Sequence, residues 1–195
     1  MKTQENILNV PNLLSFYRLL AIPFIVWSLF EENRTLFITL ICINLITDIL
    51  DGLIARAFNL CTEFGARLDS LADISTFLLS ISGFWIFEKP FVIEHQFAFI
   101  TLFSFYAVPQ LVSLLKFKRP TSFHLYSNKI VGYIQGIFIF TFFVFGYNEF
   151  YFYFMIFASC LADFEVFLLV LLLPKIISNA KSIFSIIKRK QNGTL

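Results

Sequence analysis

The chain has 195 residues, of which 58% are hydrophobic and only 14% are charged, and its mean hydropathy is +0.78. This composition excludes an ordinary soluble domain and predicts one membrane-embedded domain. A net charge of +2, without a basic run rich in aromatic residues, argues against a nucleic-acid partner. Three widely spaced cysteines, Cys42, Cys61 and Cys160, predict neither a disulfide framework nor a zinc site.

The chain begins with a polar segment, and no small-residue cleavage site follows the first apolar stretch. We therefore expect no removable signal peptide. Apolar runs bounded by polar residues predict six transmembrane helices, with the approximate ranges 13–30, 36–58, 68–87, 91–117, 125–146 and 150–173. Residues 175–195 combine an apolar face with several lysines and an arginine, which predicts an amphipathic helix on the membrane surface. The predicted organisation is an all-α membrane domain over 1–174 and a basic tail over 175–195.

The distribution of lysine and arginine predicts the orientation of the spans. The first, third and fifth connections hold two basic residues among five acidic ones, whereas both termini and the second and fourth connections hold most of the lysines and arginines. Because positively charged loops stay in the cytoplasm, both termini and these two connections are predicted to be cytoplasmic.

Four aspartates flank the second connection. Asp48 and Asp51 are three residues apart, and Asp69 and Asp73 are four apart, so each pair lies on one face of its predicted helix. An Asp within a span costs about 2.5–3.5 kcal/mol on insertion scales, so cations must offset this group. Arg56 and Arg67 could neutralise two of the aspartates, while oxygen ligands alone are typical of one or two Mg²⁺ or Mn²⁺ ions.

The residues between these aspartates favour a phosphate-containing ligand. Gly52 and Ala55 remove bulk from one helix face, where a flat base or ribose could approach the backbone. Arg56 offers a planar fork suited to phosphate oxygens, and Gly65 either caps the turn or permits another close approach. The alternative is that these small residues serve only helix packing, which is common in membrane spans.

The complete segment is Asp48-x2-Asp51-Gly52-x2-Ala55-Arg56-x8-Gly65-x3-Asp69-x3-Asp73. It resembles, at every specified position, the signature of the class I CDP-alcohol phosphotransferase family. The stretch NVPNLLSFYRL, which contains Asn12, is similar to a Pro-Asn-x-x-(Thr/Ser)-x-x-Arg stretch of many members, and the six predicted spans extend the resemblance over most of the chain.

The resemblance implies a homodimeric six-helix enzyme that joins a CDP-activated group to an alcohol and releases CMP. By analogy, Asp48, Asp51, Asp69 and Asp73 would hold two Mg²⁺ or Mn²⁺ ions, and Asp73 would also be the general base. The residues implied to line the CDP site are Gly52, Ala55, Arg56, Gly65 and Asn12. A bacterial inner membrane, with the site facing the cytoplasm, is the implied location.

The resemblance also predicts CDP-diacylglycerol as the donor. Arg119, Ser127, Lys129 and Gln135 are the candidate acceptor-binding residues, and this stretch is similar to the fifth helix of phosphatidylglycerophosphate and cardiolipin synthases. A phosphorylated acceptor such as glycerol 3-phosphate is therefore the first interpretation. Inositol phosphate, serine and phosphatidylglycerol stay open, because the fourth span lacks the Arg-Glu pair usual in phosphatidylglycerophosphate synthases.

Two further acids, Asp163 and Glu165, lie in the last predicted span. They either hydrogen-bond a headgroup or pair with Arg18 and Lys129 in a structural network, and the second interpretation is slightly favoured. A divalent-cation transporter is the rival class for the whole chain, and a scaffold is a third. The acidic segment has no second copy in the sequence, which argues against a transporter built from repeats.

Overall fold

The computed structural model describes residues 9–60, 62–119, 121 and 125–173, and the described chain is helical throughout, without a strand. It divides into two compact units, 1–93 and 94–195. The predicted amphipathic tail over 175–195 lies outside the described residues.

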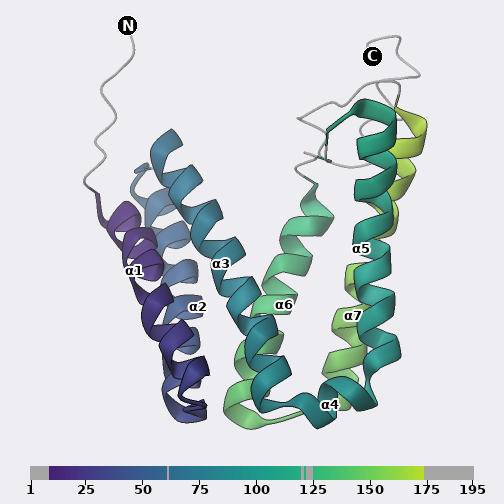
Figure 1. Cartoon of the computed structure of the whole chain (residues 1–195). Coiled ribbons are helices and arrows are strands. Elements are labelled where there is room, and N and C mark those ends of the chain that lie inside the picture. The colour runs from purple at the N-terminus through teal and green to yellow at the C-terminus, as the bar shows by residue number, and fades with distance from the viewer. Residues whose placement is uncertain (1–8, 61, 120, 122–124, 174–195) are drawn as a thin grey trace, which may run out of the picture. The chain divides into compact units, whose positions relative to one another are not determined.

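The first unit contains three long helices that lie side by side (Figure 1): α1 (Val10–Phe30), α2 (Arg34–Ala57) and α3 (Glu63–Phe87). Each helix begins after a residue whose side chain accepts a backbone N–H of the first turn. These residues are Asn9, Asn33 and Thr62. Such caps satisfy amide groups that have no partner within the helix, so the polar residues define where each span begins.

Helix α1 packs against both α2 and α3, and the core between them is apolar toward one end. Ile25, Phe37 and Ile41 are fully buried there. Gly83 of α3 lies directly against the Phe37 ring, because a Cβ placed on Gly83 would lie 2.2 Å from the Phe37 Cζ. The absence of a side chain at Gly83 therefore allows α2 and α3 to approach at this level.

In the second unit, α5 (Gln96–Phe117) and α6 (Tyr126–Phe145) both pack against α7 (Glu149–Leu172). Leu125, three α7 side chains and Leu173 form a buried apolar cluster with Val112 and Phe117 at its edge. The Lys116 ammonium donates to the carbonyl groups of Val170 and Leu171 at 2.8 and 2.9 Å, and so satisfies acceptors at the end of α7.

Six described helices are long and apolar enough to cross a membrane, which confirms the predicted all-α multi-pass fold. The fourth span begins later than predicted. The run that starts at Phe91 divides into a short helix, α4 (Lys89–Glu94), and α5, which begins after His95. The His95 ring packs against Phe152 and Tyr147 and contacts the Tyr147 hydroxyl at 3.0 Å, and this aromatic packing accompanies the break that periodicity alone did not indicate.

Replacing Gly83 by Ala should destabilise the first unit. The added methyl group overlaps the buried Phe37 ring, and such overpacking costs about 1–3 kcal/mol. Thermal unfolding in detergent measures the effect. Gly132→Ala is the matched control, because a Cβ there meets no described atom within 4 Å. Equal unfolding temperatures for the two variants would contradict the close approach of α2 and α3.

Candidate metal and nucleotide site

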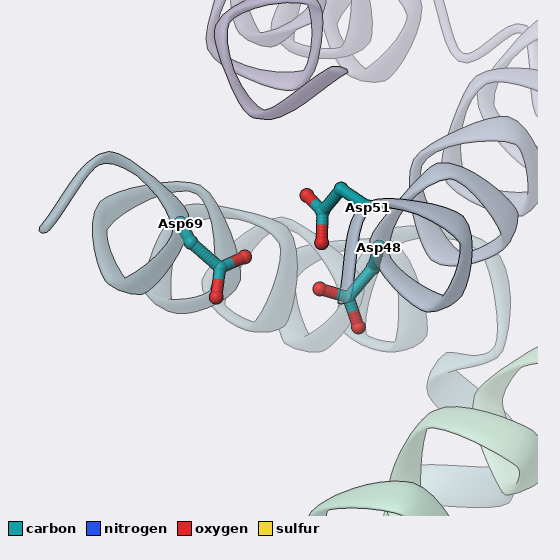
Figure 2. A group of neighbouring side chains, drawn as sticks. All are labelled: Asp48, Asp51 and Asp69. Atoms are coloured by element: carbon teal, nitrogen blue, oxygen red, sulfur yellow. The ribbon is translucent and has the colours of Figure 1, made fainter. Parts of the chain in front are cut away.

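The aspartates of the motif converge between α2 and α3. Asp48 and Asp51 lie on the last turns of α2, and Asp69 lies on the second turn of α3. Figure 2 shows their carboxylates directed toward one another, and one oxygen from each lies within 4.8 Å of the others. Three convergent carboxylate oxygens without sulfur or nitrogen ligands suit a hard divalent cation such as Mg²⁺ or Mn²⁺.

Arg18 of α1 joins these three aspartates to Asp73. Its Nη1 lies 2.7 Å from Asp48 Oδ1, 3.0 Å from Asp69 Oδ1 and 3.5 Å from Asp51 Oδ2, while its Nη2 donates to Asp73 Oδ1 at 2.5 Å. The four aspartates, here called the aspartate cluster, therefore share one guanidinium. Only 1% of the Arg18 side chain is exposed, against 51% of Asp73.

The position of Arg18 was not predicted. The sequence slightly favoured its pairing with Asp163 and Glu165, and named Arg56 and Arg67 as residues that could neutralise two of the aspartates. Arg67 instead pairs with Glu63 on the surface of α3, at 2.5 Å. A signal was present, because a single arginine in an apolar span requires a buried acidic partner, but only tertiary packing shows which acids supply it.

Ser15 supplies a second contact from α1 to the aspartate cluster. Its hydroxyl lies 2.9 Å from Asp51 Oδ2, and both side chains are buried. Asp51 is thus held by a neutral donor in addition to the longer contact with Arg18. Since hydrogen bonds restrict the rotation of a carboxylate, α1 orients the acidic groups of α2.

The small residues of the motif occupy two different environments. Gly52 and Ala55 are half-buried on α2, and the Arg56 side chain folds back toward Gly52. The Arg56 Nε donates to the Gly52 carbonyl at 2.9 Å. The guanidinium therefore lies along the face that the sequence assigned to the nucleotide, one turn beyond Asp51.

Gly65 is buried against α1. The Asn12 Nδ2 lies 3.3 Å from Thr62 Oγ1, which also accepts the Gly65 N–H at 2.9 Å. Asn9 donates to the Leu60 carbonyl at 3.3 Å. These contacts tie the beginning of α1 to the turn that connects α2 with α3.

The predicted acceptor-binding residues all belong to the second unit. Arg119 and Lys129 are exposed, and the Ser127 hydroxyl is buried without a hydrogen-bond partner among the described residues. Gln135 donates to Ser159 Oγ of α7 at 3.0 Å. Asp163 is half-buried one turn beyond Ser159 on α7.

Removing the Arg18 charge should destabilise the protein. Arg18→Met retains the length of the side chain but leaves four carboxylates without their shared counter-charge, and uncompensated buried ions cost about 3–5 kcal/mol. The unfolding temperature in detergent should fall strongly, and by less in an Asp48→Asn background. Arg67→Met, which breaks only a surface pair, should change stability by about 0.5 kcal/mol or less. A wild-type unfolding temperature for Arg18→Met would show that the four contacts do not stabilise the fold.

Comparisons with known proteins agree with the motif. Residues 8–171 match the CDP-alcohol phosphatidyltransferase family. A CDP-diacylglycerol–glycerol-3-phosphate 3-phosphatidyltransferase of Aquifex aeolicus is 39% identical over 82 residues, which are 42% of this chain and 46% of that protein. Proteins of the same name from Rickettsia bellii and Escherichia coli are 42% and 38% identical, over 37% and 33% of this chain and 40% and 37% of their own lengths.

The chain thus spans less than half the length of each of these relatives. No solved structure matches it. The family match covers most of the chain, including α1 and the complete aspartate motif, and it confirms the resemblance predicted from the sequence. The chain belongs to the CDP-alcohol phosphatidyltransferase family.

Proposed function

We propose that this protein transfers the phosphatidyl group of CDP-diacylglycerol to an alcohol and releases CMP, with glycerol 3-phosphate as the acceptor. The convergence of Asp48, Asp51 and Asp69 from two helices is the observation that carries the proposal. Family membership and the names of the relatives support the reaction and the acceptor.

The donor set fits the metal ions that the reaction requires. Asp48, Asp51 and Asp69 would hold one Mg²⁺ or Mn²⁺ ion, and Asp73 would complete a second site with them. Bound ions would neutralise charge on the pyrophosphate and on the attacking and leaving oxygens. Arg18 balances only one of the four formal negative charges of the aspartate cluster, so the cluster retains a net attraction for cations.

The chain's own groups would bind the nucleotide and move one proton. Gly52 and Ala55 leave room for the cytidine, Arg56 would contact phosphate oxygens, and Asn12 and Gly65 would complete the predicted site. Asp73, the most exposed member of the aspartate cluster, would accept the proton of the acceptor hydroxyl. The hydroxyl oxygen forms a bond to the phosphatidyl phosphorus, and the bond from that phosphorus to the oxygen of CMP breaks.

The charge distribution and the family likeness support a membrane orientation and an oligomeric state for this protein. The excess of lysine and arginine at the termini and in the second and fourth connections supports a site at the cytoplasmic face of a bacterial inner membrane. We also propose a homodimer, which the family resemblance supports. The divalent-cation transporter remains the second candidate, and the same acidic residues would then line an ion path.

Asp73→Asn should abolish the reaction. The substitution removes the proposed proton acceptor and one ligand, so CMP release should fall by about 10²-fold or more. Purified protein in detergent with Mg²⁺, CDP-diacylglycerol and glycerol 3-phosphate provides the assay, and lipid mass spectrometry identifies the product. Glu149→Gln, which also removes one carboxylate charge, is the control. Metal uptake by proteoliposomes without CMP release would favour the transporter.

Lys129 provides a test of the acceptor. If its ammonium contacts the phosphate of glycerol 3-phosphate, Lys129→Met should raise the KM for that substrate about tenfold or more, because a charge-assisted hydrogen bond contributes about 1.5–3 kcal/mol. The KM for CDP-diacylglycerol should not change. Lys89→Met, which removes a lysine over Trp85 beyond α3, is the control. An unchanged KM for glycerol 3-phosphate would exclude this role for Lys129.

A further inference from the structure

Gly65 meets α1 at a distance that no other residue could tolerate without movement. A Cβ at this position would lie 2.1 Å from Asn12 Oδ1, 3.1 Å from Asn12 Cγ and 2.8 Å from Thr62 Oγ1. Both Gly65 and Asn12 are buried, and 6% of Asn12 is exposed. The space that a side chain would fill is therefore occupied by the Asn12 amide.

The Asn12 amide in turn contacts the residue that begins α3. Its Nδ2 lies 3.3 Å from Thr62 Oγ1, and the same hydroxyl oxygen accepts the Gly65 N–H at 2.9 Å. Thr62 is the N-cap of α3, so the amide lies against the cap itself. Because a cap defines the first turn, its position determines the position of the residues that follow on the same face.

That face carries half of the aspartate cluster. Asp69 and Asp73 follow Gly65 by four and eight residues, so the three residues form one stripe along α3. Asn12, Ser15 and Arg18 follow one another at intervals of three along α1, and all three are buried. These residues of α1 contact α3 at two successive levels. Asn12 contacts the cap of α3, and Arg18 contacts Asp69 and Asp73 farther along the helix.

We propose that Gly65 is a positioning residue: it admits the Asn12 amide, and this contact holds the beginning of α3 so that Asp69 and Asp73 face α2. The inference deepens the proposed function and rests on it for its kinetic consequence. It differs from the prediction that Gly65 lines the CDP site, because Gly65 then acts through Asn12 and the aspartates rather than by touching the nucleotide.

The substitutions Gly65→Ala, Asn12→Ala and the double change distinguish these roles. The methyl group of Gly65→Ala displaces the Asn12 amide, and a shift of about 1 Å in the aspartates can lower kcat by about 10²-fold. In the double variant the main obstacle is absent, since the remaining overlap, 2.8 Å from Thr62 Oγ1, is much smaller than that with Asn12 Oδ1 at 2.1 Å. Its activity should therefore equal that of Asn12→Ala, instead of falling by the product of the two single losses.

Mn²⁺ binding, followed by electron paramagnetic resonance, tests the same inference without catalysis. Gly65→Ala should weaken binding about tenfold or more, whereas the double variant should bind as Asn12→Ala does. Gly83→Ala is the matched control for lost stability, because its methyl group also overlaps a neighbouring helix but far along α3 from the aspartates. It should lower the unfolding temperature and leave Mn²⁺ affinity unchanged.

Several results would overturn the proposal. A double variant that loses the product of both single losses, together with a raised KM for CDP-diacylglycerol and unchanged Mn²⁺ affinity, would assign Gly65 to the nucleotide. If Gly83→Ala and Gly65→Ala lost Mn²⁺ affinity equally, the contact between Gly65 and Asn12 would serve only general helix packing. If Gly65→Ala alone does not fold, recovery of folding and Mn²⁺ binding in the double variant would support the contact with Asn12, and a double variant that also fails to fold would contradict it. A wild-type protein that binds Mn²⁺ but releases no CMP would contradict the proposed function. The comparison of Mn²⁺ affinities among the variants would then still decide whether Gly65 positions the aspartates.

Discussion

The contact between the Arg18 guanidinium and four carboxylates is the constraint on which the first unit depends. An arginine within a span and an aspartate within a span are each unfavourable in lipid, by about 2.5–3.5 kcal/mol on insertion scales. Arg18 of α1 meets Asp48 and Asp51 of α2 and Asp69 and Asp73 of α3 at 2.5–3.5 Å. None of these helices can move away from the others without exposing a charge to the apolar phase, so the polar site itself contributes to helix assembly.

The remaining contacts of α1 agree with this arrangement. Asn12 meets the cap of α3, and Ser15 meets Asp51. Farther along, the helices meet through apolar contacts such as that of Gly83 with Phe37. One end of the three-helix unit is therefore held by polar contacts and the other by close packing. Polar contacts have defined directions, whereas apolar contacts allow small sliding movements, so the polar end is the better position for a site that must hold its ligands in place.

The spacing of residues predicted the elements and the acidic faces, because both depend on local geometry. Six spans, the shared face of Asp48 and Asp51, and a carboxylate group that could hold a metal ion follow from periodicity and residue type. The partners of Arg18 could not be predicted, since they lie 30 to 55 residues away in the sequence and other acids could have supplied the contact. Gly65 posed the same difficulty: its sequence context allows a cap, a ligand contact or a helix contact, and the sequence does not indicate that the Asn12 amide lies against it.

One guanidinium cannot balance four carboxylates, and this imbalance connects the fold with the proposed chemistry. If the aspartates served only to hold Arg18, one or two would be sufficient, and the others would add cost in an apolar environment. The Asp73, Asp69 and Asp48 side chains are 51%, 39% and 33% exposed, whereas only 1% of the Arg18 side chain is exposed, so the shared counter-charge is buried while three of the carboxylates stay accessible. Arg18 contacts all four carboxylates, including the most exposed one, Asp73, so its single positive charge is shared and the aspartate cluster keeps a net negative charge. An arginine and the proposed metal site can therefore share the same carboxylates, because three of the four formal negative charges stay unbalanced.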